Sequence, residues 1–148
     1  MIRHLILLSL LTVVAPLSAK SQEAPPVPDD LVKQCYNDLI AQGHYAEAVP
    51  VCEHGLESAT GKVADQLHFF TAYALYQQGR ALAESPGENQ CESARTALTK
   101  LQEATPHLDS AGAEQADTQP QLRESIRVYS ERQEAILREC TANTTPDA

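Results

Sequence analysis

The chain has 148 residues, with 20 acidic side chains against 11 Lys and Arg, and a formal net charge of -9 at pH 7. Nucleic acids and anionic membrane surfaces attract clustered Lys and Arg, so this charge argues against both as partners. A charged partner is therefore expected to be basic, although acidity also keeps an exported domain soluble.

The N-terminus has the pattern of a secretion signal. Arg3 and His4 are followed by an apolar run from Leu5 to Leu17, and a small-residue cleavage site lies at residues 17–19. The run is shorter than the ~20 residues that cross a bilayer, which favours a cleaved signal over a membrane anchor. We expect residues 1–19 to be removed and the mature protein to be periplasmic or secreted, without stable membrane insertion.

Residues 20–28 are expected to form a proline-rich linker, because a run such as Pro25-Pro26-Val27-Pro28 excludes a helix. From residue 29 onward, apolar side chains recur at helical spacing in five segments. The predicted helices cover residues 29–42, 46–59, 63–83, 90–104 and 120–140. The sequence therefore predicts one all-α domain over residues 29–140, followed by a disordered tail at 141–148.

Glycine and proline mark the expected breaks between these helices. Gly43 ends the first helix, and Gly61 lies in the break before the third. Pro50 is tolerable only near the first turn, so the second helix is expected to start late or bend. Pro106 is expected to stop the fourth helix, which leaves residues 107–119 as a linker of low order.

The helix predicted at 63–83 is apolar on two sides. A helix of this kind needs neighbours on both sides, so we expect it at the centre of the fold. Its two stripes are Leu67, Phe70 and Ala74 on one side and Phe69, Tyr73 and Tyr76 on the other.

Two segments resemble the tetratricopeptide repeat, in which a Gly turn leads into Tyr-x-Glu-Ala and a second helix. The first segment is Gly43-His-Tyr-Ala-Glu-Ala48, followed by Cys52 and Leu56. The second is Tyr76-Gln-Gln-Gly79, followed by Ala94, Leu98, Leu101 and Pro106. The turn glycines are about one 34-residue repeat apart, although the second copy would need an insertion of about ten residues. The resemblance covers about residues 29–106. It implies two antiparallel helical hairpins with the helix at 120–140 as a cap.

Four cysteines, Cys35, Cys52, Cys91 and Cys140, fit a disulfide framework in an exported chain. In a hairpin of the first two helices, Cys35 and Cys52 each lie about two helical turns from the turn at residues 43–45, so they are level. An antiparallel run of the last helix along the fourth brings Cys140 toward Cys91, with a looser match in length. We predict the pairs Cys35–Cys52 and Cys91–Cys140, which would make the fold disulfide-stabilised.

Catalytic and metal-binding motifs are not apparent in the sequence. The cysteines are expected to form bridges, which removes them as nucleophiles. His44, His54, His68 and His107 include no i,i+4 pair on one helix, the spacing that helical metal sites favour. A Gly-rich phosphate loop and a serine in a strand-turn-helix setting are both missing. We expect no enzyme activity, no metal and no cofactor.

The repeat resemblance implies a concave face lined by the helices at 29–42 and 63–83. The residues expected there are Lys33, Asn37, Ile40, Phe69, Tyr73 and Tyr76. Lys33 and Asn37 match the first part of the clamp with which some family members hold a peptide's terminal carboxylate. Phe70 stands where the second part would require an amide. In the contrasting interpretation, the last helix or its linker covers the aromatic side chains as core, because a domain this small needs all of them.

Two non-enzymatic functions fit these features. The first is a protein-interaction module of the cell envelope, an adaptor or assembly factor that binds a peptide or protein in a helical groove. The second is an inhibitor or immunity-type protein, acidic enough to mask a basic surface on a secreted or periplasmic enzyme. A small hydrolase with an unconventional site is a third class. The expected partner is another protein or peptide. The oligomeric state of this chain is left open.

Overall fold

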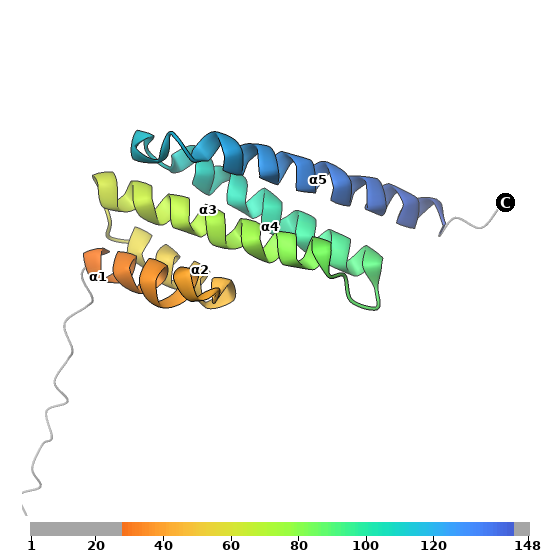
Figure 1. The fold of residues 1–148 in the computed structure, drawn as a ribbon, viewed down its shortest axis with the longest axis horizontal. Helices are drawn as coiled ribbons and strands as arrows, with labels where there is room; N and C mark the ends of the chain where they lie inside the picture. The colour runs from red at the N-terminus through yellow and green to blue at the C-terminus, as the bar shows by residue number, and fades with distance from the viewer. Residues whose placement is uncertain (1–27, 144–148) are drawn as a thin grey trace, which may run out of the picture.

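A computed structural model describes residues 28–143 as an all-α fold in which consecutive helices run antiparallel (Figure 1). The described residues form α-helices and short π or 3-10 turns. In chain order the elements are α1 (Pro28–Lys33), the π-helix η1 (Gln34–Leu39), the 3-10 turn η2 (Ile40–Gln42), α2 (Tyr45–Leu56), α3 (Gly61–Glu84), α4 (Gln90–Ser110), the 3-10 turn η3 (Ala113–Gln115) and α5 (Gln119–Ala142). The expected signal at 1–19, residues 20–27 of the expected linker and residues 144–148 of the tail lie outside the described residues.

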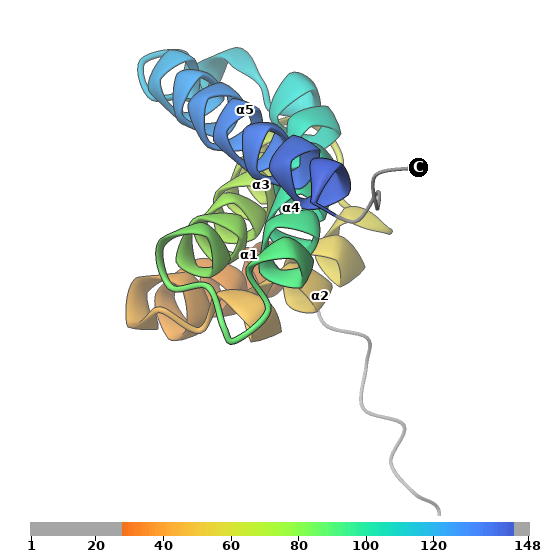
Figure 2. The same ribbon diagram turned by 90° about the vertical axis from the view of Figure 1, so that its right-hand side faces the viewer.

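The helices stack in three layers (Figure 2). The hairpin of α1 and α2 covers one side of the α3–α4 pair, and α5 lies across the other side. On the hairpin side, Leu67 and Ala74 of α3 join a buried cluster with Cys35 and Ile40. On the other side, residues of α3 that include Tyr76 join a second cluster with α4 and α5. The central place predicted for this helix is therefore confirmed.

Two glycines allow α3 to approach its neighbours closely. A Cβ atom at Gly79 would lie 2.9 Å from the Leu101 side chain and 3.1 Å from the Ala97 carbonyl oxygen of α4. A Cβ atom at Gly55 of α2 would lie 2.7 Å from Leu67. Real Cβ atoms do not sit this close to their neighbours. Glycine at these two positions therefore sets how tightly the hairpins pack.

The predicted turn at Gly43 is present. Gly43 adopts a left-handed conformation with φ of 81°, which glycine enters without a Cβ clash. Its N–H donates to Ile40 O at 3.0 Å, and the His44 N–H donates to Leu39 O at 2.9 Å. These bonds satisfy carbonyls at the end of the helical segment formed by α1, η1 and η2, where the chain turns back into α2.

Both predicted disulfides are present. Cys35 pairs with Cys52 inside the N-terminal hairpin, where both side chains are fully buried and their Cα atoms are 5.5 Å apart. Cys91 pairs with Cys140, with Cα atoms 6.0 Å apart, and joins the start of α4 to the end of α5. Structural disulfides of this kind are typical of proteins exported to an oxidising compartment.

Pro50 and Pro106 both lie in the interior of helices. Pro50 lies inside α2, which begins at Tyr45, so the late start expected from Pro50 is wrong. The helix ends at Leu56, three residues before the predicted end. Pro106 lies inside α4, which continues to Ser110, so the prediction of a stop there is wrong. Pro106 has no N–H to donate to the Gln102 carbonyl. Both residues are exposed, so water can satisfy that carbonyl.

The segment expected as a linker of low order is largely structured. Leu108 extends α4 because its side chain, 1% exposed, packs in the cluster with Leu122 and Ile126 of α5. Beyond the helix, the Gln119 side-chain amide donates to the carbonyls of Ala111 and Gly112 at 3.0 and 2.9 Å. The expected tail also starts later, since α5 continues to Ala142.

None of the helices within residues 28–143 is both long enough and apolar enough to cross a membrane.

The two disulfides should contribute unequally to stability, because the bridges close loops of different length. The sequence separation is 17 residues for Cys35–Cys52 and 49 residues for Cys91–Cys140. Loop-closure entropy predicts that removing them by paired Cys→Ala substitution lowers the free energy of unfolding by about 3 and about 4 kcal/mol, respectively. Denaturant unfolding of the two double variants checks the order. Non-reducing peptide mapping that linked Cys35 to Cys91 or Cys140 would contradict the helical register.

A pair of histidines joins α3 and α4 outside the two main clusters. The Nδ1 atoms of His68 and His107 are 3.1 Å apart, and His107 Nε2 lies 3.9 Å from Glu53 Oε1 of α2. Partial burial lowers the pKa of both imidazoles, and the neighbouring His68 lowers that of His107 further. Asp65 opposes the shift at His68, and Glu53 and Glu103 oppose it at His107, without reversing it.

This pair should make stability depend on pH near neutrality. The folded-state pKa values lie below the unfolded value of about 6.5, so below that pH the unfolded chain binds more protons than the folded protein. The free energy of unfolding should therefore be highest above pH 7 and fall as the pH drops through about 6.5 toward 5. Denaturant unfolding across this range should show a flatter dependence of the free energy of unfolding on pH for His68→Gln/His107→Gln than for the parent protein. His54→Gln, at an exposed residue of α2, is the control. Equal profiles for the double variant and the parent protein would contradict this expectation.

Candidate functional site

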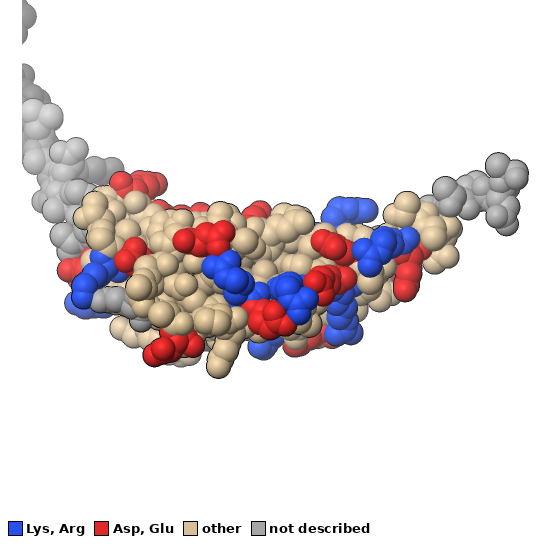
Figure 3. All heavy atoms as spheres, turned by 90° about the horizontal axis from the view of Figure 1, so that it is seen from above, with Lys and Arg blue, Asp and Glu red and all other residues tan. Residues whose placement is uncertain are grey.

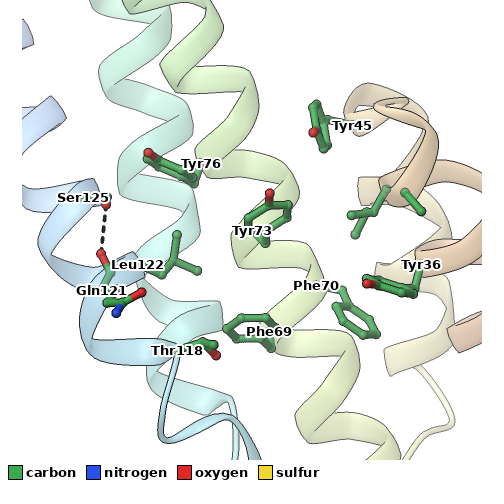
Figure 4. Close-up of a pocket in the computed structure, with 12 residues that line it drawn as sticks. Tyr36, Tyr45, Phe69, Phe70, Tyr73, Tyr76, Thr118, Gln121, Leu122 and Ser125 are labelled. Atoms are coloured by element: carbon green, nitrogen blue, oxygen red, sulfur yellow. Dashed lines mark hydrogen bonds between the residues drawn. The ribbon is translucent and has the colours of Figure 1, made fainter.

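A groove of about 590 Å³ opens over one side of α3, between the N-terminal hairpin and the start of α5 (Figure 4). Its size falls within the range of pockets that bind ligands or peptide side chains. The lining residues come from five elements, η1, η2, α2, α3 and α5, and from the turn before α5. They are Tyr36, Ile40, Ala41, Tyr45, Phe69, Phe70, Tyr73, Tyr76, Thr118, Gln121, Leu122 and Ser125.

The floor of the groove is a run of aromatic side chains on α3. Phe69, Tyr73 and Tyr76 recur at spacings of three and four residues, which places them along one side of the helix. Phe70 lies next to Phe69, with ring centroids 6.1 Å apart in an edge contact. Phe69 and Tyr73 are half-buried, whereas Tyr76 is only 9% exposed. The floor therefore runs from an accessible part into the core.

The first wall comes from the N-terminal hairpin, and the π-helix η1 positions it. In η1, Cys35 is fully buried in its disulfide, whereas the next residue, Tyr36, is 46% exposed. Tyr36 stacks on Phe70 with ring centroids 4.9 Å apart and planes 24° apart. Tyr45, the first residue of α2, meets Tyr73 in an edge contact at 6.2 Å. Short π-helical segments often occur at functional sites because the wider turn redirects side chains.

The second wall is the start of α5. Gln121, Leu122 and Ser125 face the α3 aromatics across the groove, with Thr118 at the turn before the helix (Figure 4). Leu122 is buried and joins the core cluster, while Gln121 and Thr118 are exposed. The Ser125 hydroxyl donates to the Gln121 carbonyl within the helix at 2.9 Å.

A polar clasp holds α5 to α3 beyond the Tyr76 end of the groove. The Tyr129 hydroxyl of α5 donates to the Glu84 carboxylate, and Arg80 Nε lies 3.6 Å from the same carboxylate. The hydrogen bond to Glu84 raises the pKa of Tyr129, because ionising the phenol would set two anions side by side. Tyr129 also meets Tyr76 in an edge contact at 6.0 Å. The clasp therefore fixes the spacing between α3 and α5 where the floor enters the core.

Charged side chains are absent from the lining of this groove, although the chain carries a net charge of -9. The outer face of α5 carries charge of both signs, interspersed along the helix (Figure 3). Arg123 pairs with Asp109 at 2.6 Å, and Arg127 pairs with Glu124 and Glu131 at 2.5 and 2.7 Å. The groove is thus an uncharged, aromatic surface on a strongly charged protein.

Four of the six binding residues expected from the sequence come together in this groove: Ile40, Phe69, Tyr73 and Tyr76. Lys33 and Asn37 do not line it. Lys33 is 71% exposed and lies 3.8 Å from Asp30 on its own helical turn. A carboxylate clamp built on Lys33 and Asn37 would therefore stand apart from the aromatic groove.

Sequence reasoning missed the remaining lining residues for identifiable reasons. Ordinary α-helical spacing puts Tyr36 on the same apolar side as Cys35, whereas in the π-helix η1 Tyr36 is 46% exposed. Helical spacing puts Phe70 in the stripe with Leu67 and Ala74, and the Gly43 turn pattern puts Tyr45 in the turn. The α5 wall depends on how the last helix crosses α3, which periodicity along one segment does not encode.

Within residues 28–143, no group of three or more His, Cys, Asp or Glu side chains is arranged to hold a metal ion. Comparisons of the chain with models of protein families, with curated proteins and with solved structures return no match.

The difference in burial between Tyr76 and Tyr73 predicts different effects of the same substitution. Tyr76→Ala should lower the free energy of unfolding by about 3 kcal/mol, because it removes a ring of α3 that is buried against α4 and α5. Tyr73→Ala should lower it by about 1 kcal/mol, because that ring is only partly buried. Denaturant unfolding of the oxidised variants measures both values. Equal losses would show that Tyr73 is also a core residue.

Proposed function

We propose that the protein is a non-enzymatic interaction module of the cell envelope that binds a segment of another protein in its aromatic groove. The observation that carries the proposal is the groove itself, which combines accessible aromatic rings with a polar rim. Aromatic side chains in a concave setting are the usual energetic centres of protein interfaces. Nucleic acid and anionic membrane surfaces stay disfavoured by the net charge of -9.

The order of the helices around the groove supports the same proposal. The floor and walls come mainly from η1, η2, α3 and α5, and α4 supplies none of the lining residues (Figure 4). In a tetratricopeptide-like stack, the first helices of successive hairpins line the concave binding face, and a capping helix completes it. We infer that this chain is a degenerate stack of that kind, in which α5 serves as both cap and wall.

Export to the periplasm or the cell exterior belongs to this proposal. The apolar run from Leu5 to Leu17 supports a cleaved signal, and the two disulfides require oxidising conditions. An inhibitor role would rely on a strongly acidic face to cover a basic enzyme. The interspersed charges on the outer face of α5 favour the groove over that face as the contact surface (Figure 3).

Site-specific photo-cross-linking in the native host tests the proposed function. A benzoylphenylalanine replaces Ala41 or Thr118, both exposed residues at the groove, or the control Val128, which is 48% exposed on α5 outside it. We expect the same protein adduct from Ala41 and Thr118 and none from Val128. Tyr73→Ala should weaken capture of that protein about fivefold or more, the scale of an interface hot spot, while circular dichroism stays unchanged. An adduct from Val128 alone would place the contact surface elsewhere.

A further inference from the structure

The chemistry of the groove restricts its occupant, given that the proposed function holds. The lining contains no charged side chain, so a charged group of the bound segment would gain no ion pair there. The cost of taking that group out of water would then stay largely uncompensated, whereas an uncharged segment avoids it. The groove therefore favours an uncharged contact region over a terminal carboxylate or a cluster of basic side chains.

Hydrogen bonding in the groove distinguishes an extended segment from a helix. Among the described residues, the hydroxyls of Tyr36, Tyr45 and Tyr73 and the side-chain amide of Gln121 take part in no intramolecular hydrogen bond. Each hydroxyl can donate to or accept from a bound segment, and the Gln121 amide offers both a donor and an acceptor. A bound α-helix uses its own carbonyls internally and would meet these groups with its side chains only. An extended chain presents free backbone carbonyls to them.

The aromatic rings specify which extended chain fits. The stacked pair Tyr36–Phe70 and the edge pair Tyr45–Tyr73 hold flat, rigid rings around the groove. Aromatic-lined grooves of this type accept prolyl rings, and proline-rich chains are already ordered as polyproline II before they bind. From Phe69 to Tyr76 the floor extends about 10 Å along α3, which matches about one turn of polyproline II.

We propose that the groove binds a proline-rich, uncharged segment of a partner protein in the polyproline II conformation. The prolyl rings lie on Phe69, Phe70 and Tyr73, and the carbonyls of the segment accept hydrogen bonds from the tyrosine hydroxyls. A prolyl residue contributes a backbone carbonyl and no N–H, so it can accept a hydrogen bond from a tyrosine hydroxyl without adding an unpaired donor of its own.

Titration of the oxidised protein, labelled with ¹³C in its tyrosine rings, tests this assignment by NMR. The probe is the peptide acetyl-(Ala-Pro-Pro)₃-amide. One comparison peptide is an uncharged helix former of Ala, Leu and Gln of equal length, and the other is a Gly-Ser peptide. We expect saturable shifts of the Tyr36, Tyr45 and Tyr73 rings with the proline-rich peptide only. The Tyr129 ring, engaged with Glu84 outside the groove, should stay unchanged.

Matched variants make the test specific to the proposed contacts. Tyr73→Phe keeps the ring and removes only the hydroxyl, so it should weaken the proline-rich peptide about tenfold, the loss that one well-formed hydrogen bond accounts for. Tyr36→Phe provides a second hydroxyl deletion in case the first alters the fold. Val128→Ala, outside the groove, should leave affinity unchanged. Unchanged binding in both hydroxyl deletions would overturn the hydrogen-bonding part of the proposal.

The remaining outcomes separate this inference from the proposed function. Shifts of the groove tyrosines with the helical peptide alone would overturn the polyproline assignment and leave a binding groove. The lack of saturable shifts with every peptide would overturn the assignment and count against the groove as well. Residues 25–28 of this chain are themselves Pro-Pro-Val-Pro. If the double substitution Pro25→Ala/Pro26→Ala changed the NMR shifts of the groove tyrosines without added peptide, the occupant would be the chain's own segment. That result would overturn the assignment of the groove to a partner protein.

Discussion

Because α3 carries apolar side chains around most of its circumference, it needs cover on several sides, and this requirement arranges the other helices. The N-terminal hairpin covers Leu67 and Ala74, while α4 and α5 cover Leu75 and Tyr76. Close packing at Gly79 brings α4 against α3. The aromatic stripe of Phe69, Tyr73 and Tyr76 is only partly covered by these helices. It forms the floor of the groove, and the N-terminal hairpin and α5, which bury the other sides of α3, form its walls.

A small domain has little core with which to hold such walls in place, and covalent and polar ties supply part of the restraint. The Cys35–Cys52 disulfide anchors the same π-helical turn that presents Tyr36 to the groove. The Cys91–Cys140 disulfide fixes the far end of α5, and the contact between Tyr129 and Glu84 holds its middle to α3. The two walls are thus restrained independently of whatever lies between them, which would lower the entropic cost of the proposed binding.

Charge and aromatic character are separated on this molecule. The ion pairs of α5 lie on its outer face, and the lining of the groove holds neutral residues only (Figure 3). In the proposed function, ring packing and hydrogen bonding would select the ligand, and the surrounding charge would act on solubility and approach. The pair of His68 and His107 lies on another side of α3, so the pH dependence of stability expected from it would not involve the groove.

The sequence by itself determined the helical class, the central place of α3 and the pairing of the cysteines, because helical periodicity and rise depend only on spacing along one segment. It also placed Phe69, Tyr73 and Tyr76 on one side of α3. Only the tertiary structure decided that α4 continues through Pro106, since the burial of Leu108 against α5 outweighs one lost hydrogen bond. Likewise, only the packed structure turned Tyr36 outward and brought Gln121 and Leu122 opposite it. Those positions depend on contacts between residues far apart in the chain, which local patterns do not encode.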